Sequence, residues 1–145
     1  MEEILELKEL IKKRDYDGAM KIVEEMEEMS KKDIINNIRS YAVILLLHLI
    51  KREVENRTTS SWDDSIDFSI LEIQALNRRQ EGKGNYLNRE ELKELMEQDA
   101  FRLAIIKARR EVFKGVLAPK EIAARVDKDT LINKALDMIA SDIDS

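Results

Sequence analysis

The stretch YAVILLLHLI, residues 41–50, decides the fold class of this chain. Residues 42–47 are apolar without interruption, so a helix built from them is apolar on every side and must be surrounded by protein. His48 interrupts the stretch, which is much shorter than the roughly 20 apolar residues that span a bilayer. We therefore expect a central core helix at about residues 32–56, and no membrane-spanning segment.

The rest of the chain repeats apolar residues at helical spacing around this segment. The pattern predicts an all-α fold, a bundle of five or six helices with the central apolar helix at its middle. Polar turn signals separate the helices at 15–18, near 30, at 57–60 and at 81–85. The remaining helices are predicted at 2–14, at 19–30, from Ser61 onward, from Asn88 to about Lys114, and from Asp129 or Thr130 to about Ile143, with Pro119 in a first helical turn before the last of them.

Composition points to the same class. Hydrophobic residues make up 43% of the 145 positions, and four Gly and one Pro are few for a fold with many turns. A chain of this length is the usual size of one domain, so we expect a single helical domain over residues 1–145.

Charge and cysteine content narrow the function classes. Lys and Arg number 25 against 30 Asp and Glu, a net charge of −5, which disfavours binding to nucleic acid. The segment 119–136 has some features of a helix-turn-helix, but the residues from Asp127 onward carry two bases against five acids. There is no cysteine, which is compatible with a reducing cytoplasm, and we expect a cytoplasmic protein.

Carboxylates on helix faces are the weak metal candidates. Asp63, Asp64 and Asp67 stand at i, i+1 and i+4, a spacing that can hold a divalent cation, although acids after Ser61 also suit an ordinary helix N-terminus. Acidic helix faces at 24–28 and 91–97 supply half of a four-carboxylate magnesium site. No second half follows them, so we expect neither a metal nor a cofactor.

His48 is the only histidine of the chain, with Lys51 one turn later and Trp62 after a polar linker. We expect its imidazole near the rim of the core, bonded to a carbonyl or carboxylate, and the Trp62 ring packed back onto the preceding helix. The segment His48-Leu49-Ile50-Lys51, followed by Ser60-Ser61-Trp62, resembles the bacterial family called domain of unknown function 29. That resemblance implies a small helical protein with no assigned activity, in which His48, Lys51 and Trp62 matter together.

The function most consistent with these features is a non-catalytic helical module for protein–protein interaction or self-association, because many helix faces are apolar and no complete catalytic set is present. We expect a homodimer or a protein partner. The alternative is a small metal-dependent nucleotide- or ligand-binding enzyme that uses the acidic helix faces, or a pocket at His48 and Trp62.

Overall fold

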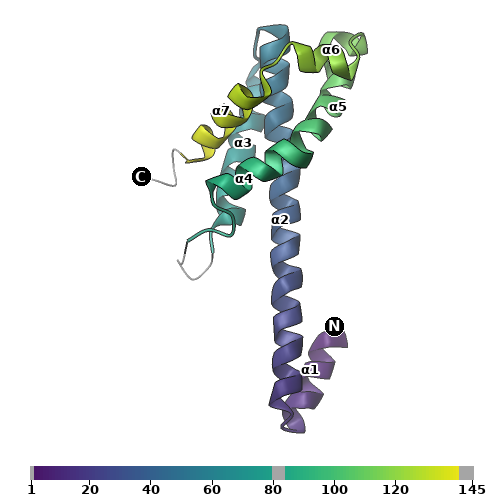
Figure 1. Ribbon diagram of the computed structural model, residues 1–145, viewed down its shortest axis with the longest axis vertical. Coiled ribbons are helices and arrows are strands. Elements are labelled where there is room, and N and C mark those ends of the chain that lie inside the picture. The colour runs from purple at the N-terminus through teal and green to yellow at the C-terminus, as the bar shows by residue number, and fades with distance from the viewer. Residues whose placement is uncertain (1, 80–83, 141–145) are drawn as a thin grey trace. The chain divides into compact units, whose positions relative to one another are not determined.

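The computed structural model describes residues 2–79 and 84–140 (Figure 1). These residues form six α-helices when α4, the π-turn η1 and α5 are counted as one continuous helix, so the predicted all-α class is confirmed. The elements in chain order are α1 (Glu2–Lys12), α2 (Tyr16–Glu55), α3 (Ser60–Asn77), α4 (Arg89–Leu95), the π-turn η1 (Met96–Ala100), α5 (Phe101–Glu111), the 3₁₀ turn η2 (Val112–Gly115), α6 (Pro119–Ala124) and α7 (Lys128–Ala140).

The chain divides into two compact units, and the boundary falls inside α2. The N-terminal unit is Met1–Ile35 and the C-terminal unit is Asn36–Ser145. Each unit is described by itself. That residues 1–145 fold as a single domain stays a prediction, which the hydrogen-exchange experiment below addresses.

The predicted break near Ser30 is wrong, because α2 is one helix from Tyr16 to Glu55. No Gly or Pro lies between Gly18 and Glu55, and the two lysines after Ser30 are good helix formers, so nothing forces the backbone out of the helix. The central apolar helix, predicted at about 32–56, is therefore the second half of a longer helix. It ends where Asn56 takes a left-handed conformation, with φ of 51°.

In the N-terminal unit, Asp15 begins α2. The Gly18 N–H donates to Asp15 Oδ1 at 2.9 Å, and the Ala19 N–H donates to the Asp15 carbonyl at 3.0 Å. The turn predicted at 15–18 is thus shifted, because residues 16–18 already belong to α2 and Arg14, with φ of 61°, makes the bend. A Cβ atom on Gly18 would lie 2.6 Å from Asp15 Oδ2, so any other residue there would push the Asp15 carboxylate out of this position.

The core of the C-terminal unit lies around the second half of α2, as the apolar stretch predicts. Among its residues, Leu45, Leu46 and Ile50 are fully buried. Helix α3 contacts α2 through the rings of Tyr41 and Phe68, whose centroids are 6.0 Å apart. Helix α7 packs on α3 and α4, and α5 packs on α6 (Figure 1). The core helix predicted at about residues 32–56 is buried from Ile38 onward on its inner face, while Ile34 and Ile35 are only partly buried.

Helix starts agree with the sequence in two cases and differ in two. Asn88 and Glu91 form the predicted capping box, and Pro119 is the first residue of α6. Helix α3 is capped by Thr59 and not by Ser61, because the Thr59 hydroxyl accepts the backbone N–H of Trp62 at 3.0 Å. Helix α7 is capped by Asp127 and not by Asp129 or Thr130.

Asp127 meets both criteria of a helix N-cap. Its carboxylate accepts the Thr130 N–H at 3.3 Å, and its carbonyl accepts the Leu131 N–H at 2.9 Å. The last turn predicted for this helix, around Ile143, and most of the loop predicted at 81–85 lie outside the described residues.

The predicted helix from Asn88 to Lys114 exists in outline but departs from α-helical geometry twice. A π-turn occupies Met96–Ala100, with both end residues fully buried. The helix then ends at Glu111, because Phe113 and Lys114 both take left-handed conformations, with φ of 44° and 57°. Apolar spacing carries no information on either departure, since Phe113 continues the helical pattern.

Helix α2 is long and apolar enough, by length and composition, to cross a membrane. Its most apolar 18-residue window has a mean hydropathy of 1.3, and 44% of that window is buried inside the structure. The core helix of a water-soluble protein has the same composition when other helices surround it. The burial of Leu45, Leu46 and Ile50 favours the interpretation of this segment as a core helix.

Candidate functional site at the end of α2

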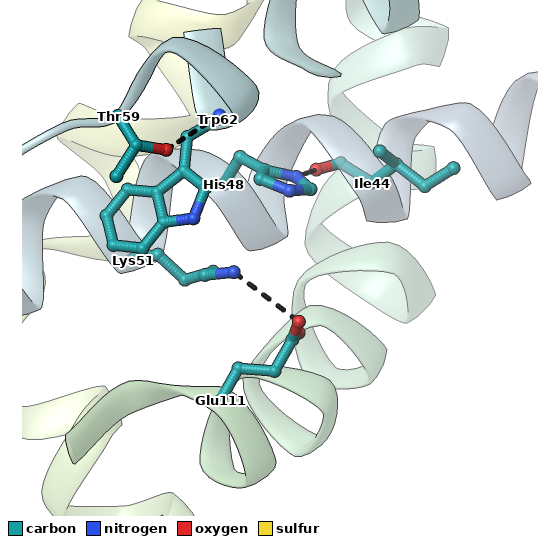
Figure 2. Close-up of polar contacts among 6 residues, drawn as sticks. All are labelled: Ile44, His48, Lys51, Thr59, Trp62 and Glu111. Carbon is teal, nitrogen blue, oxygen red and sulfur yellow. Dashed lines mark hydrogen bonds and ion pairs between the residues drawn. The ribbon is translucent and has the colours of Figure 1, made fainter. Parts of the chain in front are cut away.

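The residues singled out from the sequence gather where the last turns of α2 meet the start of α3 and the end of α5. Thr59, as the cap of α3, fixes the helix start and so places the Trp62 side chain beside α2 (Figure 2). Lys51 comes from α2, and its Nζ atom lies 4.7 Å from the centroid of the Trp62 ring. The structure thus brings Lys51 and Trp62 together.

Lys51 is a buried cation with two partners. Its side chain is 8% exposed, and its Nζ atom lies 3.4 Å from Glu111 Oε1 on the last residue of α5. The Trp62 ring, a face of negative charge density, is the second partner. One ammonium group therefore links α2 to both α3 and α5.

His48 bonds to the backbone of its own helix. Its Nδ1 atom lies 2.8 Å from the Ile44 carbonyl oxygen, and since a carbonyl can only accept, Nδ1 carries the proton. In the neutral ring, Nε2 is then the atom with a free lone pair. The half-buried imidazole sits as expected, near the rim of the core and bonded to a carbonyl (Figure 2).

Trp62 packs back onto the end of α2, as its place after the linker suggests. The Arg57 guanidinium carbon lies 4.6 Å from the centroid of the ring, in addition to Lys51. Among the described residues the indole N–H makes no hydrogen bond, and the contacts of the ring are with Lys51 and Arg57. The ring therefore acts through its face, which holds two cations at the α2–α3 junction.

The acidic motif after the linker is engaged by neighbouring side chains. Asp63 Oδ1 accepts the Thr58 hydroxyl at 2.5 Å and lies 3.8 Å from an Arg52 guanidinium nitrogen. Asp64 and Asp67 are exposed. Within residues 2–79 and 84–140, no three acidic, His or Cys side chains come close enough to hold a metal ion. These carboxylates carry no observation that points to a cation.

A pocket of about 430 Å³ lies beside this cluster, between the end of α2, the linker and the first turns of α7. Arg52, Arg57 and Lys134 line it together with Glu53 and Asp127. His48, Lys51 and Trp62 do not line it. It is therefore a different pocket from the one predicted at His48 and Trp62, which stays a prediction, and its lining residues are of mixed charge.

Two members of this cluster could not be found from the sequence. Glu111 follows Lys51 by sixty positions, and no spacing rule connects them. Arg57 belongs to the polar linker, where a helix stop is the ordinary interpretation. The contact between Lys51 and Glu111 depends on the tertiary packing of α5 against α2. The contact between Arg57 and the Trp62 ring depends on the cap at Thr59, which places that ring.

The end of α2 is a junction between three helices. Three helices are joined through one buried cation and one aromatic ring, and no group of three or more acidic, His or Cys side chains within the described residues could hold a metal ion. The chain matches the family described as "Domain of unknown function DUF29" over residues 4–134, and it belongs to that family. No curated protein and no solved structure matched the chain. The match covers far more than the His48–Trp62 segment and reaches into α7.

Proposed function

We propose that this protein is a non-catalytic interaction module that associates with a second copy of itself through the N-terminal unit. One observation carries the proposal: helix α1 has no buried residue, although its sequence is rich in apolar side chains. The exposed fractions are 45% for Ile4, 61% for Leu5 and 51% for Ile11. An apolar helix without a covered face is typical of a surface that a partner covers.

The first half of α2 adds to this surface. Met20 and Met29 are each 56% exposed and Tyr16 is 65% exposed, while Ala19 and Ile22 are the buried residues of the described N-terminal unit. A hairpin of two helices is too small to stabilise itself by burial. Two such hairpins packed together make a four-helix arrangement in which these apolar faces are shared, and twofold symmetry lets one patch serve both copies.

Light scattering after gel filtration of the full chain tests this proposal. We expect a mass of about twice 16.9 kDa, falling toward the monomer on dilution. The variant Leu5→Glu/Met20→Glu should be monomeric at concentrations where the native chain is dimeric, because it places two charges in the apolar contact.

Leu71→Glu is the matched control, since Leu71 on α3 is 59% exposed, close to the 61% of Leu5. This control should keep the dimer mass, and circular dichroism should show full helix content in every variant. A native chain that stays monomeric at all concentrations, or a dimer that Leu71→Glu disrupts as strongly as Leu5→Glu/Met20→Glu, overturns the proposal.

We also propose that the protein acts in the bacterial cytoplasm and crosses no membrane. Two features support this: the absence of cysteine from the sequence and the burial of the most apolar part of α2 by the protein's own helices. Fractionation of cells that express the tagged chain is the test. Recovery in the membrane pellet after a high-salt wash would contradict it.

A further inference from the structure

Helix α5 has two faces of opposite character. Its buried face consists of Phe101, Ala104, Ile105 and Ala108. The opposite side, here called the α5 outer face, consists of exposed residues that fall within less than half of the helix circumference at 100° per residue. These residues are Arg102, Leu103, Ile106, Lys107, Arg109 and Arg110.

The cations of this face have no partners. Arg102, Lys107, Arg109 and Arg110 make no hydrogen bond or ion pair with any of the residues that the structure describes. The one acid of α5, Glu111, is paired with Lys51 instead. A chain with a net charge of −5 thus concentrates four unneutralised positive charges on three turns of one helix.

Apolar side chains lie among these charges. Leu103 is 40% exposed and Ile106 is 42% exposed, and they stand at i and i+3. This is the spacing of a helix-packing seam, and the cations on either side occupy the positions that form salt bridges across such a seam. The α5 outer face therefore has the layout of one half of a helix–helix interface.

The segment after α5 also exposes apolar side chains. Phe113 is 43% exposed and Val116 is 78% exposed. Phe113 and Lys114 are consecutive non-glycine residues in the left-handed region, a conformation that is unfavourable for residues with a side chain. Unfavourable backbone conformations beside an exposed aromatic ring are typical of a surface under functional constraint.

We propose that the α5 outer face binds an acidic amphipathic helix of a partner protein. Charge complementarity carries the choice of partner, because a helix with Glu or Asp beside an apolar stripe neutralises the four cations and covers Leu103 and Ile106 together. A nucleic-acid backbone supplies the negative charge but leaves the apolar side chains uncovered. This surface is separate from the N-terminal unit, so the inference does not depend on the self-association proposed above.

The test uses the full chain and a fluorescent synthetic helix with a Leu stripe flanked by Glu. We expect the Arg102→Glu/Arg109→Glu variant to weaken binding at least about tenfold, because it replaces two attractions by repulsions. Leu103→Ala should weaken it about fivefold through loss of buried apolar area. A second peptide with Gln in place of Glu should bind at least about tenfold more weakly than the first.

Matched controls make the same changes elsewhere in the C-terminal unit. Arg78→Glu/Lys134→Glu alters the net charge equally at two exposed cations, and Leu71→Ala removes an exposed leucine. Both should change binding less than about twofold. Leu5→Glu/Met20→Glu should bind the peptide like the native chain, so failure of one proposal is distinguishable from failure of the other.

Three outcomes overturn the inference. The first is no binding of the Glu peptide by the native chain. The second is tighter binding of duplex DNA, RNA or phosphatidylglycerol vesicles than of the peptide, with the same dependence on Arg102 and Arg109. The third is a loss of dimer mass in Arg102→Glu/Arg109→Glu, which would make a second copy the occupant of this face.

Discussion

The Nζ atom of Lys51 lies 3.4 Å from the Oε1 atom of Glu111, and the two members of this ion pair differ sharply in their access to water. The Lys51 side chain is 8% exposed, whereas that of Glu111 is 45% exposed. If Lys51 is neutralised, Glu111 can be solvated where it stands. If Glu111 is neutralised, the Lys51 ammonium keeps only the Trp62 ring as a partner in a nearly dry environment.

This difference predicts unequal effects of the two single substitutions. Glu111→Gln should lower the free energy of unfolding by about 1–3 kcal/mol, since a buried charge loses its countercharge. Lys51→Met, which keeps the length of the stem, should cost less than about 1 kcal/mol. Urea unfolding followed by circular dichroism measures both. A larger loss in Lys51→Met than in Glu111→Gln would contradict this expectation. It would mean that removing the Lys51 charge lowers the free energy of unfolding more than leaving that charge without its countercharge.

Asn77 at the end of α3 holds the segment before α4. Its Nδ2 donates to the Leu87 carbonyl at 2.9 Å, and its Oδ1 accepts the Leu87 N–H at 2.8 Å, with the side chain buried. Asn77→Ala leaves both backbone groups unpaired, and we expect a loss of about 2–4 kcal/mol in the free energy of unfolding.

Ser69→Ala is the control for that measurement. Ser69 is also fully buried, but its hydroxyl has no hydrogen-bond partner among the described residues. Removal of an unpaired hydroxyl should leave stability within about 1 kcal/mol of the native value or raise it. Similar losses for Asn77→Ala and Ser69→Ala would mean that packing volume, and not hydrogen bonding, decides both.

The two units should differ in local stability. No residue of α1 is buried, whereas Leu45 and its neighbours are fully buried. In the monomeric variant Leu5→Glu/Met20→Glu, amide hydrogens of Glu2–Lys12 should exchange at least about a hundredfold faster than those of residues 42–50. Hydrogen exchange followed by mass spectrometry measures this ratio. Equal protection in both segments would instead show one cooperative domain over the whole chain.

The cap of α7 predicts a dependence of stability on pH. The backbone N–H of Thr130 holds the pKa of the Asp127 carboxyl below its ordinary value of 3.8, with further lowering by the Thr130 hydroxyl. The folded pKa lies below the unfolded one, so the ionised carboxylate stabilises the fold above the unfolded pKa. That contribution is lost as the pH falls through the folded pKa.

Asp127→Asn keeps a capping oxygen but does not titrate. The difference in unfolding free energy between the native chain and this variant should be constant near neutral pH and shrink below about pH 4. Urea unfolding at a series of pH values checks it. Asp129→Asn, two residues later in the chain, serves as the comparison. A difference that persists unchanged at the lowest pH would show that ionisation of the Asp127 carboxyl does not cause the pH dependence.

Sequence patterns predict the helices and their buried faces, but not where the chain bends between helices. Residues 42–47 predict their own burial because an apolar run needs no knowledge of the rest of the chain. The break predicted near Ser30 is wrong because a few polar residues resemble a turn, while the segment holds no Gly or Pro to disfavour the helix there. The left-handed bend at Phe113 was missed because its cause lies in packing and not in a turn-forming residue.

The candidate cluster shows the same division. His48, Lys51 and Trp62 could be singled out because they lie within fifteen positions of one another, so helix periodicity and the linker relate them. Glu111 could not, since its contact with Lys51 depends on how α5 packs on α2. Likewise, Asp99 and Glu111 flank α5 but pair with Arg39 and Lys51 of α2, which charge counts along the chain do not show.

The π-turn at Met96–Ala100 has a consequence for how relatives of this chain should be compared. Buried residues recur at every fourth position from Leu92 through Met96, Ala100, Ala104 and Ala108, and an ideal α-helix would rotate that series by about 40° at each step. The wider turn absorbs part of this rotation. A homologue lacking one residue between Leu95 and Ala100 would therefore need a gap there in the alignment, because an ungapped pairing would match the lining of its core to solvent-facing positions of this one.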